Sequence, residues 1–163
     1  MTDGISRFVY AIYIRTTPEK LWAALTAPEF TRQYWYGVIL ESDWKAGSPW
    51  KMHHPEGLVS DEGEVAESDP PRRLALRWRH KWKPELAADG ESFCVIELEP
   101  VDGAVKLTIN HSVARRDSKL IEAVGGGWPR ILSNLKTLLE TGSVAFAVKP
   151  VEKTPNRAPS RNG

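Results

Sequence analysis

The feature that most constrains the fold is an amphipathic segment at residues 125–142, GGGWPRILSNLKTLLETG. Its apolar residues follow the 3.6-residue spacing of one helix face. These residues are Trp128, Ile131, Leu132, Leu135, Leu138 and Leu139. Pro129 suits a first helical turn, and Gly142 suits the left-handed residue that closes a helix. We therefore predict a helix over 127–141 that lies on an apolar surface formed by the rest of the chain.

A run of glycines at 125–127 precedes this predicted helix. Such a run can form a phosphate-binding loop, but no Gly-Lys-Ser/Thr follows it here. Glycine also provides a flexible entry to a helix, because it has no Cβ atom. We interpret the run as that entry and not as a phosphate site.

The length and charge of the chain limit its class. A chain of 163 residues suits one domain with a single core. Lys and Arg number 22 and Asp and Glu 21, a formal net charge of +1, which disfavours nucleic acid and anionic membranes as partners. Cys94 is the single cysteine, and neither a cleavable leader nor an 18-residue apolar run occurs. We expect a soluble, cytoplasmic protein.

The chain ahead of the predicted helix begins with a strand and two short helices. Residues 8–15 are β-branched and aromatic, which predicts a strand covered at least partly on both faces. Pro18 then opens a predicted helix over about 18–26, and a second helix follows at 28–34.

From residue 36 to residue 113 the pattern is one of strands and short turns. Turns of hairpin length predict neighbouring strands, and so an antiparallel sheet of six or seven strands. The predicted strands are 36–42, 49–54, a segment that ends at 68, 72–80, 92–99 and 104–113.

Alternation within these strands gives the predicted sheet one apolar face and one polar face that contacts solvent. On the apolar face of 72–80 lie Leu74, Leu76, Trp78 and His80. On the apolar face of 104–113 lie Val105, Leu107, Ile109, His111 and Val113. This face mixes apolar side chains with polar-tipped ones near the strand ends, which suits a cavity as well as a core.

The order of elements resembles the helix-grip fold of the START and birch-pollen-allergen superfamily, also called SRPBCC. Local motifs are similar to the branch named for the activator of the heat-shock protein 90 (Hsp90) ATPase. The motifs are Glu29-Phe30 with Trp35, Gly47 in the next turn, GEVAESDPPRRLALRW at 63–78, and GGWPRILSNLKTLLETG at 126–142. The resemblance covers about residues 8–142. It implies an α+β fold: a curved antiparallel sheet of six or seven strands grips a long C-terminal helix, with two short helices after strand one.

The end of the chain is expected to differ from the domain. Small and charged residues with several prolines follow Ser143, a composition typical of disorder. Val144, Phe146 and Val148 alternate, so a short extra strand there remains open. We predict one helix-grip domain over 1–142 and a disordered tail over 143–163.

The resemblance implies a cavity between sheet and helix, in which relatives bind lipids, hormones or polyketides, or catalyse cyclisation. The eukaryotic activator docks on its chaperone through a separate N-terminal domain, and only about seven residues precede the first predicted strand here. We therefore expect non-catalytic binding of a small hydrophobic or aromatic molecule. One alternative is a co-chaperone-like or stress-response module, with a protein partner or as a homodimer. A second alternative is an enzyme on a polyketide-like substrate.

The expected cavity lining combines aromatic, aliphatic and polar-tipped side chains. Indole rings can hold a flat apolar ligand and their N–H groups can orient it, although core packing is the other interpretation. Trp82 is left out because it lies in a predicted loop. The candidate residues are Trp35, Trp50, Met52, His54, Leu76, Trp78, His80, Ile109, His111, Trp128, Ile131, Leu132 and Leu135.

The sequence contains no recognisable catalytic constellation. His54, His80 and His111 could converge on a metal or act in proton transfer, but they lack ligand spacing along the chain, so rim histidines are the simpler interpretation. Cys94 lies in an apolar strand, and no Gly-x-Ser-x-Gly elbow occurs. We predict no catalytic residue, no metal and no cofactor.

Overall fold

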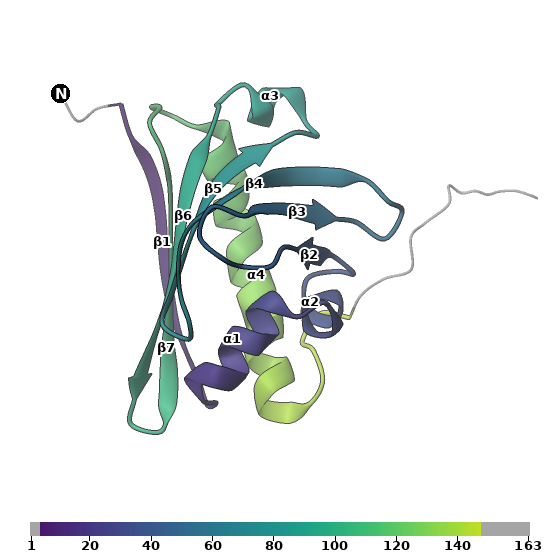
Figure 1. Ribbon diagram of the computed structural model, residues 1–163, viewed down its shortest axis with the longest axis vertical. Helices are drawn as coiled ribbons and strands as arrows, with labels where there is room; N and C mark the ends of the chain where they lie inside the picture. The colour runs from purple at the N-terminus through teal and green to yellow at the C-terminus, as the bar shows by residue number, and fades with distance from the viewer. Residues whose placement is uncertain (1–3, 148–163) are drawn as a thin grey trace, which may run out of the picture.

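Seven antiparallel strands form one curved sheet in the order β1-β7-β6-β5-β4-β3-β2 (Figure 1). The computed structural model describes residues 4–147. The strands are β1 (Ser6–Ile14), β2 (Ile39–Glu41), β3 (Pro49–His53), β4 (Val59–Asp69), β5 (Arg73–His80), β6 (Ser92–Val101) and β7 (Ala104–Val113). The helices are α1 (Pro18–Thr26), α2 (Pro28–Tyr34), α3 (Pro84–Ala87) and α4 (Lys119–Thr141). This architecture confirms the predicted α+β helix-grip fold.

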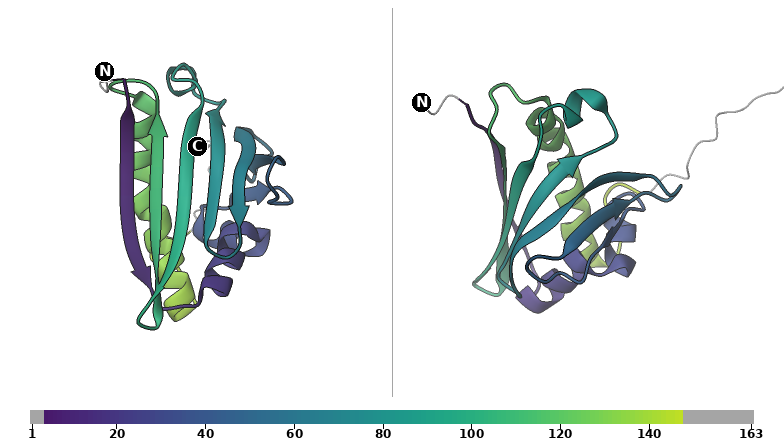
Figure 2. Two further views of the ribbon diagram at one scale, coloured as in Figure 1. Left: turned by 60° about the vertical axis from the view of Figure 1, so that its left-hand side comes forward. Right: turned by 45° about the horizontal axis from the view of Figure 1, so that its top comes forward.

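The two faces of the sheet differ as the alternation predicted. In β7 every second residue from Val105 to Val113 is buried, and in β5 Leu74, Leu76, Trp78 and His80 are buried. Helix α4 lies along this apolar face, beside β1 (Figure 2). The prediction that β1 is covered on both faces was wrong: Val9 and Tyr13 are 56% and 52% exposed. Its outward residues are exposed because the helices pack on the other side of the sheet.

Helix α4 begins eight residues earlier than the predicted start, at Lys119 and not at residue 127. Ser118 is its N-cap, and the Ser118 side chain accepts a hydrogen bond from the Ile121 N–H at 3.0 Å. Asp89 strengthens this cap, because its Oδ2 accepts the Ser118 hydroxyl at 2.6 Å and the Leu120 N–H at 3.0 Å. The glycine run and Pro129 therefore lie inside the helix.

Packing explains one of these glycines. A Cβ atom at Gly125 would lie 3.2 Å from the ring of Phe8 on β1, closer than ordinary van der Waals contact. The absent side chain thus lets the helix approach the edge strand. At the other end, the expected left-handed residue is confirmed: Gly142 has φ 91° and its N–H bonds to the Leu138 carbonyl at 2.8 Å.

The predicted strand 36–42 is shorter in the structure, because Tyr36 and Gly37 have φ values of 52° and 81°. Two left-handed residues in succession interrupt an extended chain. Gly37 also passes close to Pro55, whose Cγ would lie 2.7 Å from an added Cβ. β2 is consequently reduced to Ile39–Glu41.

The segment after Gly142 begins as a turn against α4. The Asn134 side chain accepts the Phe146 N–H at 2.6 Å and donates to the Phe146 carbonyl at 3.0 Å. The Arg130 guanidinium lies 4.2 Å from the centre of the Phe146 ring. The extra strand left open for 144–148 does not form over 144–147, the part that the structure describes. The tail residues 148–163 lie outside the described residues.

Candidate ligand-binding pocket

A pocket of about 510 Å³ opens between the sheet, the segment after α2, the α3 loop and the first half of α4. The strands contribute Met52, Asp61, Trp78 and His80. The α3 loop contributes Trp82, Lys83 and Leu86. Helix α4 contributes Leu120, Ala123, Val124, Gly127, Trp128 and Ile131. The remaining lining residues are Trp35, Tyr36, His54 and Ser60.

Seven of the thirteen candidate residues meet at this pocket. They are Trp35, Met52, His54, Trp78, His80, Trp128 and Ile131. Trp50 and Leu76 instead border a void of only about 10 Å³ beneath it. Ile109, His111, Leu132 and Leu135 are fully buried in the core. These six residues are buried and do not line the pocket.

Other lining residues were missed by the sequence analysis. The α4 residues before 127 were missed because the helix start was placed too late. Asp61 was overlooked among acidic neighbours, although it shares strand parity with the buried Val65. That parity was the available signal, since residues two and four apart along a strand lie on the same face.

Asp61 is the centre of a buried polar network on the pocket wall. Its Oδ2 accepts the Trp78 indole N–H at 2.7 Å and the His80 Nδ1–H at 2.9 Å. Its Oδ1 accepts the hydroxyl of Ser60. Only 9% of the side chain is exposed for either Asp61 or His80. Such a fully paired network fixes the orientation of Trp78 and His80.

The hydrogen bonds also assign the histidine tautomers. His80 Nε2 accepts the Lys83 backbone N–H at 3.0 Å, so the proton of the neutral ring lies on Nδ1. Ser60 donates its proton to Asp61, so His54 Nε2 donates to Ser60 across 2.8 Å. The ring of His54 lies 5.9 Å from that of Trp82. A polar chain thus runs from the partly exposed His54 to the buried Asp61.

His111 belongs to a separate network in the core. Its Nδ1 accepts the Trp128 indole N–H at 3.3 Å, and its Nε2 lies 2.8 Å from the Ser92 hydroxyl. Burial lowers the pKa of His111 to about 4, although the negative charge of Asp61 opposes this shift. The three histidines therefore do not converge on one point. Within residues 4–147, no group of three or more His, Cys, Asp or Glu residues is arranged so that it could hold a metal ion.

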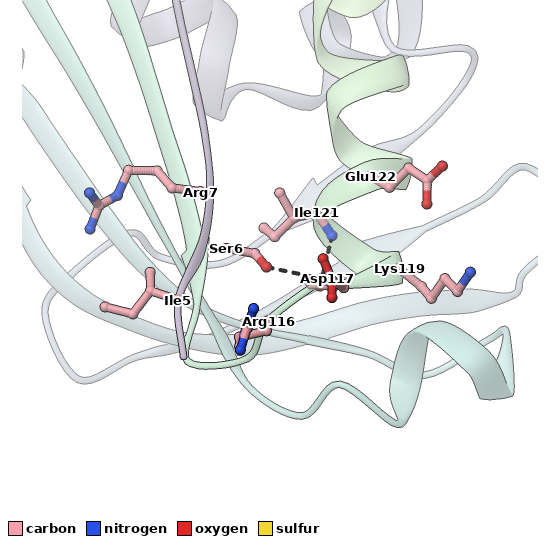
Figure 3. A pocket seen from close by; sticks show the side chains of 9 residues that line it. Ile5, Ser6, Arg7, Arg116, Asp117, Lys119, Ile121 and Glu122 are labelled. Atoms are coloured by element: carbon pink, nitrogen blue, oxygen red, sulfur yellow. Dashed lines mark hydrogen bonds between the residues drawn. The ribbon is translucent and has the colours of Figure 1, made fainter. Parts of the chain in front are cut away.

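A second hollow, of about 530 Å³, lies at the start of α4 (Figure 3). Its lining is mainly charged or polar, and includes Arg7, Asp117 and Lys119. Lys119 and Glu122 extend away from the helix and do not point toward Arg7 (Figure 3). No aromatic residue lines this hollow, so the candidate site is the pocket between the sheet and α4.

The curved sheet, the gripped helix and the pocket between them define a helix-grip protein. The chain belongs to the family described as Activator of Hsp90 ATPase homolog 1-like protein, whose sequence model matches residues 15–140. No curated protein sequence matches the chain. Among the helices described within residues 4–147, none is both long and apolar enough to cross a membrane.

Solved structures share the fold at low sequence identity. MLL2253 from Mesorhizobium loti is 24% identical over 85% of this chain and 100% of its own, with a TM-score of 0.72. The Aha1 dimer from Colwellia psychrerythraea is 20% identical over 84% and 98%, with a TM-score of 0.69. The Hsp90 activator PFC0360w from Plasmodium falciparum is 22% identical over 82% and 96%, with a TM-score of 0.66.

Proposed function

We propose that the protein binds a small aromatic or apolar molecule in the pocket between the sheet and α4. The observation that carries this proposal is the lining: aromatic side chains from four separate segments surround about 510 Å³. Pockets for small molecules have volumes of about 300–1,000 Å³ and combine apolar walls with a few fixed polar groups. Asp61, Ser60 and His80 are such polar groups here.

Aromatic contacts support a preformed wall for the ligand. Trp128 meets Trp35 edge to face with ring centres 5.3 Å apart, and meets Trp78 at 6.1 Å. The indole N–H groups of Trp78 and Trp128 are bound to Asp61 and His111. Rings held in this way lose little conformational entropy when a ligand binds, which favours affinity.

A glycine pair on α4 offers a direct test. Gly127 lines the pocket, whereas Gly126 does not and is exposed, and an added Cβ at either position meets no atom within 4 Å. Gly127→Leu should fill the pocket, and Gly126→Leu is its matched control on the solvent side. The ligand itself is identified by native mass spectrometry of protein purified from its own host, followed by solvent extraction.

The expected result is a bound small molecule on the wild type and on Gly126→Leu, and at least a tenfold lower occupancy on Gly127→Leu. Equal occupancy in both variants would place the ligand elsewhere. A wild type that carries no molecule and binds none of a panel of aromatic probes would reject the proposal.

A second candidate function is that of an Hsp90 co-chaperone, favoured by membership of the activator family. A docking surface on this domain would then raise the ATP turnover of the host's Hsp90. The measurement is the steady-state ATPase rate of Hsp90 with and without the protein. An unchanged rate at saturating protein rejects this function and leaves the ligand-binding proposal intact.

A further inference from the structure

The residue that points beyond general apolar binding is Tyr36. Its side chain lines the pocket. Resting on the proposed function, we propose that the Tyr36 hydroxyl donates a hydrogen bond to an oxygen of the bound molecule. The ligand class is then an aromatic or apolar molecule that carries an acceptor oxygen, such as a ketone.

The Tyr36 hydroxyl is the one buried side-chain polar atom within residues 4–147 that has no hydrogen-bond partner. Buried polar groups in native proteins are nearly always paired, and each exception requires an explanation. Tyr34, two residues earlier, follows the rule, because its hydroxyl donates to the Ala24 carbonyl at 2.9 Å. The missing partner is thus specific to Tyr36. Because the hydroxyl is closed to solvent, its ring must turn toward the adjoining pocket to meet an acceptor on a molecule bound there.

The backbone of Tyr36 gives an independent indication. Its φ of 52° lies in the left-handed region, which is unfavourable for a bulky residue such as tyrosine. Strained residues persist where the surrounding structure enforces them, and they cluster at ligand sites. Strain and an unpaired hydroxyl therefore coincide at one residue of the pocket wall.

Several other polar groups of the pocket wall already have partners. The indoles of Trp78 and Trp128 donate to Asp61 and His111. The carboxylate of Asp61 and the ring of His80 are paired as well. Tyr36 thus places an unpaired buried donor on this wall. A ligand acceptor matches this donor, and a purely apolar ligand leaves it unpaired.

The test uses two probes of nearly equal shape, 2-acetylnaphthalene and 2-ethylnaphthalene, which differ by the ketone oxygen. Their dissociation constants are measured by NMR titration on the wild type, Tyr36→Phe and the control Tyr13→Phe. Tyr13 lies on the outward face of β1, away from the pocket. One buried hydrogen bond corresponds to about a tenfold preference for the ketone.

We expect this preference in the wild type and in Tyr13→Phe, and its loss in Tyr36→Phe. A preference that survives in Tyr36→Phe overturns the assignment of the hydroxyl. Equal binding of both probes to the wild type also overturns it, while leaving the proposed function standing. If neither probe binds the wild type, the proposed function fails and this inference fails with it.

A folding readout accompanies the titrations. Removing an unpaired hydroxyl does not weaken the fold, so the urea midpoint of Tyr36→Phe should equal or exceed that of the wild type. Tyr34→Phe removes a paired hydroxyl and should lower the midpoint. A lower midpoint for Tyr36→Phe would mean that the hydroxyl has a partner in the protein, and the inference would be wrong.

Discussion

Replacing Asp61 by alanine should destabilise the protein far more than replacing it by asparagine. Asp61→Ala removes one acceptor group but leaves three donors behind, on Ser60, Trp78 and His80. These donors belong to residues that are 2%, 5% and 7% exposed, so water replaces the carboxylate poorly. The substitution therefore tests whether the polar network stabilises the pocket wall.

The magnitude follows from the three orphaned donors. Each buried donor that loses its acceptor costs about 1–3 kcal/mol, so Asp61→Ala should lower the free energy of unfolding by at least about 3 kcal/mol. That is a large part of the 5–15 kcal/mol typical of a domain. In Asp61→Asn the amide oxygen can still accept from Trp78 and His80, and Ser60 can accept from the amide NH₂. We expect a cost of about 1 kcal/mol for that variant.

The assay is urea unfolding followed by tryptophan fluorescence, with far-UV circular dichroism as a second probe. Coincident transitions by the two probes justify a two-state treatment. Near-UV circular dichroism of Asp61→Asn should keep the native tryptophan signals. A loss below about 1 kcal/mol for Asp61→Ala, or equal losses for both variants, would falsify the argument that these three donors depend on Asp61.

Three further predictions concern helix α4 and pH. Gly126→Ala should stabilise the protein by about 0.5–1 kcal/mol, because alanine favours a helix and no atom lies near its Cβ. Gly125→Ala should give no stabilisation, because its Cβ would press on the ring of Phe8. Thermal unfolding compares the two variants. Ser118→Ala should cost about 1 kcal/mol through loss of the N-cap, measured by urea unfolding. The pKa of His111 falls from 6.5 to about 4 on folding. Between pH 6.5 and pH 4 the imidazole is therefore protonated in the unfolded chain but neutral in the folded protein. Stability should therefore be complete above pH 6.5 and fall by up to about 3 kcal/mol toward pH 4. Urea unfolding at pH 7 and pH 4.5 measures the difference in unfolding free energy between the two pH values. This difference should be smaller in His111→Gln than in the wild type.

Local periodicity was enough to predict the fold class. The stripe from Trp128 to Leu139 and the alternation in β5 and β7 are each set by neighbours along the chain, and both are present in the structure. The start of α4 was not predictable in this way. Three glycines and a proline oppose a helix by propensity, and contacts with Asp89 and Phe8, distant in sequence, override that preference.

The candidate pocket was predictable only in part, because depth is a property of the assembled layers. Parity assigns His111 and Trp78 to the same face of the sheet, but only the arrangement of α4 decides that His111 is sealed and Trp78 borders the pocket. Tyr36 gives no signal in sequence. Its hydroxyl stands out because it is buried without a hydrogen-bond partner, and this can be recognised only from the folded structure.

The run of glycines in α4 makes the size of the pocket adjustable at a single position. Gly127 borders the pocket, and open space lies where its Cβ would be. Alanine, valine or leucine there would reduce the volume in steps, while Leu132 and Leu135, one and two turns further along, keep α4 anchored to the sheet. One methylene group changes discrimination between apolar ligands by about 1–3 kcal/mol. Substitution at position 127 alone should therefore change the size of molecule that the proposed site accepts, without repacking the core.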